Sequence, residues 1–174
     1  MIYFIRNKET GRIKIGKANN PQNRIKTLQT GCDGELELLA FIPGETDVEL
    51  EWHREYEGFH HRGEWFNPDP SLLWEIYKMQ PLQSKPESYR IWNEIINHCT
   101  NEPCWIGISL VDPHTTNTTN FMMNLPIVSR ASGIPLSQIK NVFCRIPAVK
   151  DVSFQSEWVV INFDELVDYW LADF

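Results

Sequence analysis

The stretch IYFIRNKETGRIKIG, residues 2–16, decides the fold of the N-terminal half of the chain. Two short runs rich in Ile, Tyr and Phe, residues 2–6 and 12–16, flank a polar segment that ends in Gly11. β-Branched and aromatic residues favour strands, and a glycine between two such runs supplies the left-handed backbone geometry of a tight turn. The stretch therefore predicts a β-hairpin.

The segments that follow the hairpin predict a helix, a third strand and a second helix. Asn20 followed by Pro21 is typical of a helix start, and Gly31 ends that helix. Residues 35–42 form an apolar run that predicts a strand, and either Thr46 or Asp47 can cap a helix running to about residue 58. The predicted order is β-β-α-β-α, a three-stranded antiparallel sheet flanked by helices, and residues 69–78 add a short helix.

A change of composition divides the chain into two predicted domains. Residues 79–86 contain two prolines among polar residues and predict a linker between a domain at 1–78 and a second at 87–174. The second domain is predicted to hold a helix over 87–99, a strand over 105–111, a polar loop through residue 120, a helix–turn–helix over 127–145, a hairpin of 152–154 with 158–163, and a helix over 164–171. This order predicts a small winged-helix-like α+β domain, so the whole chain is assigned to the α/β (α+β) class.

Composition bounds the class of protein. The chain has 174 residues, 42% hydrophobic and 12% aromatic, which excludes a mostly disordered protein. Its apolar runs are far too short to span a membrane and no leader pattern is present, so a cytoplasmic protein without a membrane partner is expected. The four cysteines are expected to be reduced thiols. A net charge of -7 argues against a protein that simply coats DNA.

The charge is unevenly distributed along the chain. Residues 1–30 hold seven Lys and Arg residues against the single acid Glu9, whereas residues 31–80 hold twelve acidic residues against three basic ones. Acidic groups beside a basic segment are what a metal-assisted phosphodiesterase needs. The same acidic run is also explained by a solvated helix face or by a surface that contacts a protein partner.

Five motifs follow one another along the predicted elements: Tyr3, Lys14-Ile15-Gly16, Arg24, Glu49 with His53 four residues later, and Gly63-Glu64-Trp65-Phe66. This ordered set resembles the GIY-YIG nuclease superfamily. It is most similar to the meiotically up-regulated gene 113-like branch, which is common in phages and bacteria and in which Lys-Ile-Gly often forms the second motif. The resemblance covers about the first 70 residues.

The resemblance implies a metal-dependent endonuclease, with double-stranded DNA as the expected partner. It places Tyr3 as the group that takes the proton of the attacking water and Arg24 as the cation on the phosphate. Glu49 is placed as the carboxylate that holds Mg2+ or Mn2+, an ion whose oxygen ligands are often completed by water. His53 lies one turn along the same helix face, as a supporting group, proton donor or phosphate contact.

Two points in the motif set stay open at this stage. Lys14 stands where the superfamily usually has a second tyrosine, and an ammonium there would favour the ionised form of Tyr3 or hold a phosphate. Glu64 is an alternative metal ligand. It could equally belong to a structural clasp, paired with Arg24 or Arg62.

Polar and basic residues outside the motifs predict the surface that grips nucleic acid: Arg12, Lys17, Lys26 and Asn67 in the first domain, and Lys140 and Arg145 in the second. A metal-dependent endonuclease with a C-terminal targeting or partner-binding domain is therefore the leading hypothesis. The competing one is a non-catalytic module that binds nucleic acid or protein through a degenerate site. A third is a second domain whose acidic surface mimics DNA or docks on a protein.

Overall fold

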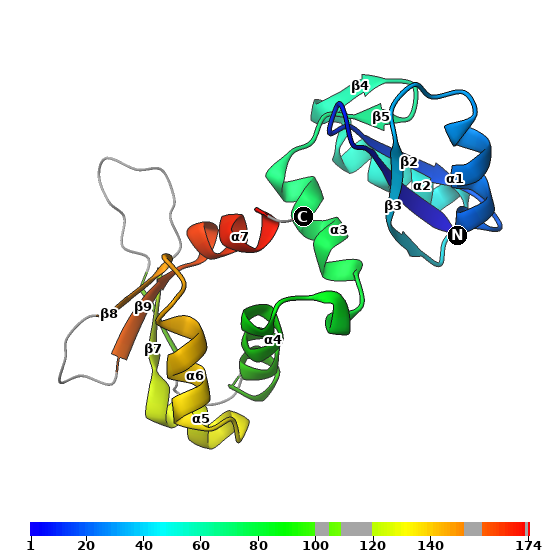
Figure 1. The fold of residues 1–174 in the computed structure, drawn as a ribbon. Coiled ribbons are helices and arrows are strands. Elements are labelled where there is room, and N and C mark those ends of the chain that lie inside the picture. Colours follow the sequence, from blue (N-terminus) through cyan, green and yellow to red (C-terminus); the bar gives the residue numbers. More distant parts are fainter. Residues whose placement is uncertain (100–104, 109–119, 152–157, 173) are drawn as a thin grey trace. The chain divides into compact units, whose positions relative to one another are not determined.

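The computed structural model describes residues 1–99, 105–108, 120–151, 158–172 and 174 of the chain. It divides into two compact units, Met1–Pro81 and Leu82–Phe174 (Figure 1). The boundary lies inside the segment 79–86 that the sequence predicts as a linker. Each unit combines helices with its own antiparallel sheet, as expected for the α+β class.

The first unit is built on a five-stranded antiparallel sheet in the order β3-β1-β2-β5-β4 (Figure 1). The three predicted strands are present as β1 (Ile2–Asn7), β2 (Ile13–Lys17) and β3 (Leu36–Ile42). Two further strands, β4 (His60–Arg62) and β5 (Trp65–Phe66), extend the sheet from β2. The prediction of a three-stranded sheet was therefore incomplete, because runs of three and two residues are too short to show an alternating pattern.

The hairpin of β1 and β2 has the predicted turn and fixes which residues share a face. Gly11 adopts a φ of 70°, the left-handed geometry that glycine accommodates without a steric penalty. In the antiparallel register, Tyr3 lies opposite Gly16 and Ile5 lies opposite Lys14. Because side chains alternate between faces along a strand, these four residues lie on one face of the sheet.

Helices cover both faces of this sheet. On the face of Tyr3 and Ile5, apolar side chains from α1 (Pro21–Gln29) pack into the core. On the other face, the ring of Phe4 meets Trp52 of α2 (Thr46–Glu55) with centroids 4.8 Å apart. The N-cap of α2 is Glu45, not the predicted Thr46 or Asp47, and its side chain makes no capping hydrogen bond. The short 3-10 helix η1 (Glu57–Phe59) follows α2, and α3 (Pro70–Met79) completes the unit.

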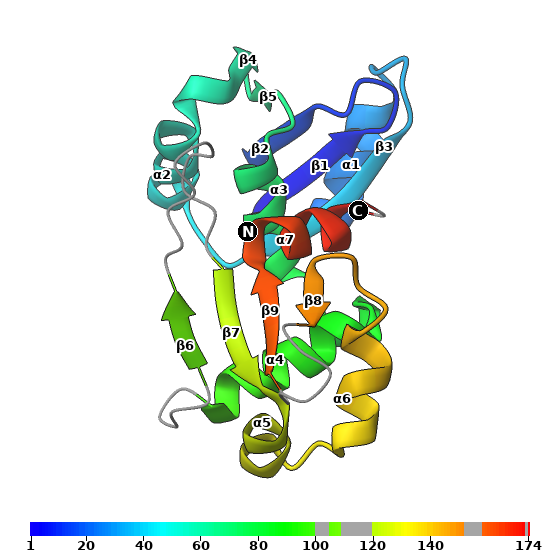
Figure 2. The same cartoon turned by 90° about the vertical axis from the view of Figure 1, so that its left-hand side faces the viewer.

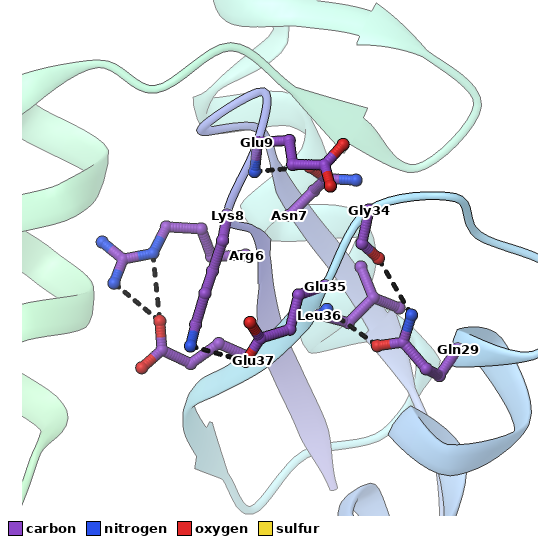
Figure 3. Close-up of polar contacts among 9 residues, drawn as sticks. All are labelled: Arg6, Asn7, Lys8, Glu9, Gln29, Gly34, Glu35, Leu36 and Glu37. Carbon is purple, nitrogen blue, oxygen red and sulfur yellow. Dashed lines mark hydrogen bonds and ion pairs between the residues drawn. The ribbon is translucent and has the colours of Figure 1, made fainter.

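Polar side chains fasten β3 to its neighbours (Figure 3). Arg6 Nη2 lies 2.7 Å from Glu37 Oε2, and Lys8 Nζ lies 2.7 Å from Glu35 Oε1. At the end of α1, the Gln29 amide donates to the carbonyl of Gly34 at 2.9 Å and accepts from the backbone N–H of Leu36 at 2.8 Å. The Gln29 amide thus supplies the hydrogen bonds that a further strand would otherwise give to the start of β3.

Asn7 joins the hairpin turn to the loop after α1. Its Oδ1 accepts hydrogen bonds from the backbone N–H groups of Glu9 and Thr10, each at 3.0 Å, and its Nδ2 lies 3.4 Å from Cys32 Sγ. A Cβ on Gly34 would lie 2.6 Å from Asn7 Nδ2, so a glycine is needed where the loop passes this amide. Asn7 is only 8% exposed, and its polar atoms are satisfied inside the protein.

The second unit has a four-stranded antiparallel sheet in the order β6-β7-β9-β8, whose strands lie side by side in Figure 2. Its elements, in chain order, are η2 (Leu82–Ser84), α4 (Glu87–Cys99), β6 (Trp105–Ile108), β7 (Asn120–Asn124), α5 (Leu125–Ser132), α6 (Leu136–Phe143), β8 (Val149–Asp151), β9 (Trp158–Asn162) and α7 (Phe163–Leu171). Aromatic packing forms the core: Trp92 contacts Phe143, Phe163 and Trp170, and the Trp170 indole N–H donates to Ser88 Oγ at 3.0 Å.

The order of a helix pair followed by a hairpin is present in this unit. Gly133, with a φ of 72°, ends α5 where the turn was predicted. Strand β7 was missed because its apolar run is only Phe121 to Met123. The predicted strand over 152–154, the last residues of the strand predicted over 105–111 and the predicted loop up to residue 119 lie outside the described residues. Strand β9 pairs with β8 on one side and with β7 on the other. The winged-helix assignment stays a prediction. Among the described helices, none is long and apolar enough to cross a membrane.

The role of Asn7 generates a stability prediction. Replacing Asn7 with Ala removes the acceptor of two backbone N–H groups and leaves them without a partner. We expect the free energy of unfolding to fall by about 1–3 kcal/mol in urea denaturation. As a control, Asn23→Ala at an exposed site on α1 should change stability by less than about 0.5 kcal/mol. Equal stabilities of the two variants would contradict the role given to Asn7.

Tyr56, at the end of α2, makes stability depend on alkaline pH. Burial raises the pKa of its hydroxyl from 10.0 to about 12, and nearby carboxylates, first that of Glu55, add to the shift. Between these values the folded chain keeps a proton that the unfolded chain has lost, so the free energy of unfolding falls as the pH rises. Below pH 10 this contribution to stability is fully present. Tyr56→Phe should flatten the decline of the free energy of unfolding between about pH 10 and pH 12, as measured by urea titrations. An unchanged slope would assign that decline to other groups.

Candidate functional site

Tyr3 lies at the centre of the candidate site. It is 1% exposed, in the middle of the sheet, and its ring lies against the backbone of Gly16 on β2. A Cβ built on Gly16 would lie 2.7 Å from Tyr3 Cζ and would also clash with the hydroxyl oxygen. Because glycine stands at position 16, the Tyr3 ring can cross β2 and carry its hydroxyl to that strand.

Arg24 of α1 contacts that hydroxyl. The side-chain hydrogen bond to Tyr3 raises the pKa of the Arg24 guanidinium, and the Glu64 carboxylate contributes in the same direction. Helix α1 can place Arg24 there because Asn20 and Pro21 fix its start and Ile25 packs onto the sheet. The cation and the phenol, far apart in sequence, thus form one polar cluster.

Lys14 and Glu64 complete this cluster on the same face. Lys14 Nζ lies 2.5 Å from Glu64 Oε2 and 5.6 Å from the centroid of the Trp65 ring, although Lys14 itself is only 8% exposed. The Glu64 backbone carbonyl accepts from the N–H of Ile15 at 3.0 Å, which fixes the residue beside β2. The Glu64 side chain is 44% exposed, so its carboxylate is open to solvent while it pairs with Lys14. The expected partners of Glu64 are Arg24 and Arg62. The Glu64 carboxylate raises the pKa of Arg24, but its ion pair is with Lys14.

His53 of α2 lies at the edge of β2. Its Nε2 donates to the carbonyl of Ile15 at 3.0 Å, and its ring meets Phe66 with centroids 5.2 Å apart. A carbonyl can only accept, so Nε2 carries the proton of this hydrogen bond. Glu49, one turn earlier on α2, is partly exposed. No contact recorded among the described residues joins Glu49 to Tyr3, Arg24 or Lys14.

The residues predicted to grip nucleic acid occupy different places. Lys17 is held by Glu45 and Thr46, at 3.0 and 2.8 Å from its Nζ. Lys26 is exposed on α1, and Asn67 is exposed just after β5, with its backbone N–H bonded to the carbonyl of Phe59. In the second unit, Lys140 is exposed on α6 and Arg145 is exposed just after it.

Asn7 and Arg62 belong to the surroundings of the site in ways that the sequence did not reveal. Both line a pocket that also includes Arg12 and Trp65. The signal for Asn7 was weak: an Asn four residues before Gly11 is typical of a turn that the Asn side chain closes. The sequence pattern does not indicate that residues 7, 32 and 62 lie around one pocket, because they belong to separate elements of the unit.

The site can support phosphate chemistry through two cations and one carboxylate around a phenol. Arg24 and Lys14 can stabilise negative charge on a phosphate, and the Glu64 carboxylate offers the hard oxygen ligands that Mg2+ prefers. Within the described part of the chain, no group of three or more His, Cys, Asp or Glu side chains is placed to hold a metal ion. An ion at this site would therefore be held by one carboxylate, with water and phosphate oxygens completing its shell.

One protein family matches the first part of the chain. The model of the T5orf172 domain matches residues 1–99, which reaches past the first unit to the end of α4. Neither a search of curated proteins nor a search of solved structures found a match. The chain belongs to the T5orf172 domain family, which is related to nuclease-like domains of the GIY-YIG/HNH type.

Proposed function

We propose that this protein is a metal-dependent endonuclease of the meiotically up-regulated gene 113-like branch, which hydrolyses phosphodiester bonds of DNA in its first unit. One observation carries the proposal: Tyr3, Arg24, Lys14 and Glu64 form one connected cluster on one face of the sheet. Family membership supports a nuclease-like function.

In the proposed mechanism Tyr3 acts in its phenolate form, beside the cations Arg24 and Lys14, and accepts the proton of the attacking water. Its hydroxyl is positioned by the close approach to Gly16, and its interaction with Arg24 raises the pKa of the guanidinium. Arg24 stays charged beside it and stabilises the additional negative charge of the pentavalent phosphate. Lys14, in the place of the superfamily's second tyrosine, binds a non-bridging oxygen when it exchanges Glu64 for the substrate phosphate.

The carboxylate best placed to hold Mg2+ or Mn2+ is Glu64, because it lies in the cluster and is half exposed. Glu49 is the second candidate, since it precedes His53 by one turn on α2. The ion would neutralise charge on the phosphate and on the leaving oxygen. His53, whose Nε2 proton is committed to Ile15, can act through Nδ1 as a proton acceptor or phosphate contact.

A second candidate function is non-catalytic binding of nucleic acid or of a protein. The Lys14–Glu64 ion pair favours it, because a carboxylate paired with an ammonium 2.5 Å away is partly neutralised as a metal ligand. In this case Arg24 and Lys14 would grip a phosphate without cutting, and the acidic surface of α2 would contact a partner. Activity measurements separate the two functions.

A plasmid-nicking assay with Mg2+ or Mn2+ tests the active-site assignment. Tyr3→Phe removes only the hydroxyl, and Glu64→Gln removes only the charge, so both should fold. We expect each to lower the nicking rate by roughly 10²- to 10⁴-fold, because general base catalysis and charge stabilisation are worth that much. Glu49→Gln, measured beside Glu64→Gln, shows which carboxylate the ion needs.

The matched controls are Tyr169→Phe and Glu51→Gln, which change the same chemical groups at exposed positions on α7 and α2. Both should nick like the wild type. Nicking that survives Tyr3→Phe and both Gln substitutions in the site would overturn the assignment. No nicking of any DNA by the wild type would favour the binding module.

The second unit is proposed to help bind DNA through α6 and the residue that follows it. The double variant Lys140→Ala, Arg145→Ala should weaken DNA binding and lower the slope of log K against log salt concentration by about 2, one phosphate contact for each residue. Lys78→Ala, whose ammonium pairs with Glu75 at 2.6 Å, should leave the slope unchanged. An identical slope in the double variant and the wild type would contradict a DNA-binding role for this surface.

A further inference from the structure

A pocket of about 220 Å3 opens beside the candidate site in the first unit. Its wall comes from three places: the β1–β2 turn, the loop after α1, and the strands β4 and β5. The residues that matter for its chemistry are Asn7, Arg12, Cys32, His61, Arg62 and Trp65. Proposed roles in phosphate chemistry use only Arg12 of this set, so the pocket has no function assigned to it so far.

The two arginines give the pocket a positive charge that no acid cancels. Three other cations of the hairpin region, Arg6, Lys8 and Lys17, each pair with a glutamate. Within the described part of the chain, by contrast, neither Arg12 nor Arg62 has a carboxylate partner. Two guanidinium groups that line one pocket repel each other, and an anion between them relieves that repulsion. A phosphate oxygen is the anion whose geometry suits paired arginines best.

The indole of Trp65 links the pocket to the catalytic cluster. It lines the pocket, and the ammonium of Lys14 lies 5.6 Å from its ring centroid. A ligand in the pocket is therefore only one side chain away from Lys14 and Glu64. An aromatic wall beside cations is the arrangement by which proteins hold an unpaired base and its phosphate.

Asn7, which shares the polar lining of the pocket with Thr10 and His61, has already used its hydrogen-bonding groups inside the protein. Its Oδ1 accepts from two backbone N–H groups, and its Nδ2 lies against Cys32 Sγ. It therefore has little capacity to read the edge of a base. Binding in this pocket would depend on stacking and charge, which do not discriminate between bases.

We propose that this pocket holds one unpaired nucleotide of the substrate, with its base stacked on Trp65 and its phosphate between Arg12 and Arg62. The inference rests on the proposed function, because it takes the Tyr3 cluster as the place of cleavage. The inference adds to that function a preferred class of substrate. The enzyme prefers strands with an unpaired nucleotide beside the bond that is cut, such as single strands and flaps, over continuous duplex.

The test measures binding of the full chain to a labelled oligothymidine and to a duplex of the same length, by fluorescence anisotropy in EDTA so that no cleavage occurs. We expect tighter binding of the single strand. Arg62→Ala should weaken it roughly 10-fold and lower the salt slope by about 0.7, the value for one phosphate contact on a single strand. Trp65→Phe should weaken it at an unchanged slope, since stacking involves no ion release. Urea denaturation confirms that each variant is folded.

The matched control is Arg54→Ala, which removes an exposed arginine from a different pocket, formed by α2 and Phe66. It should bind both probes like the wild type. If Arg62→Ala and Arg12→Ala bind like Arg54→Ala, the pocket inference is overturned while the proposed function stands. Equal affinity for duplex and single strand would also overturn it. A wild-type protein that binds neither probe would instead refute the proposed function itself.

Discussion

The close approach of Tyr3 to Gly16 is the constraint on which the first unit depends. The strand register places the two residues opposite each other, and the absent Cβ at position 16 leaves the room that the Tyr3 ring occupies. The ring in turn helps to form the core against which α1 packs, and its hydroxyl meets Arg24. A single glycine thus couples the hairpin, the helix and the candidate site, so the fold and the chemistry share one steric requirement.

Charge cancellation within the first unit determines which cations remain available to a ligand. The chain is acidic overall, although its first 30 residues are strongly basic. Glutamates from later elements pair with four of these cations, Arg6, Lys8, Lys14 and Lys17. Exposed pairs of this kind add little stability. Their larger effect is on recognition, because the local positive field becomes concentrated where the glutamates do not reach.

Much of the fold could be predicted from the sequence because the relevant signals are local. Runs of β-branched, aromatic and apolar residues predicted β1 to β3, and the start at Asn20 and Pro21 with the stop at Gly31 predicted α1. Strands β4 and β5 could not be predicted, because so short a strand is defined by its neighbour and not by its own residues. The residues of the candidate site were found by motif order. Their partners were not: the contact between Lys14 and Glu64 spans fifty positions, and only the assembled sheet brings the two together.

The contact of His53 with Ile15 has a consequence for the behaviour of the protein in a crowded solution. Strand β5 pairs with β2 only at Ile13 and Lys14, so the edge of β2 beyond that point would be open to a strand from another molecule. The imidazole occupies the Ile15 carbonyl and the Glu64 carbonyl occupies the Ile15 N–H, so together they block that addition. Without the His53 ring the Ile15 carbonyl would be open to a strand from another molecule, so the same side chain lines the candidate site and limits aggregation.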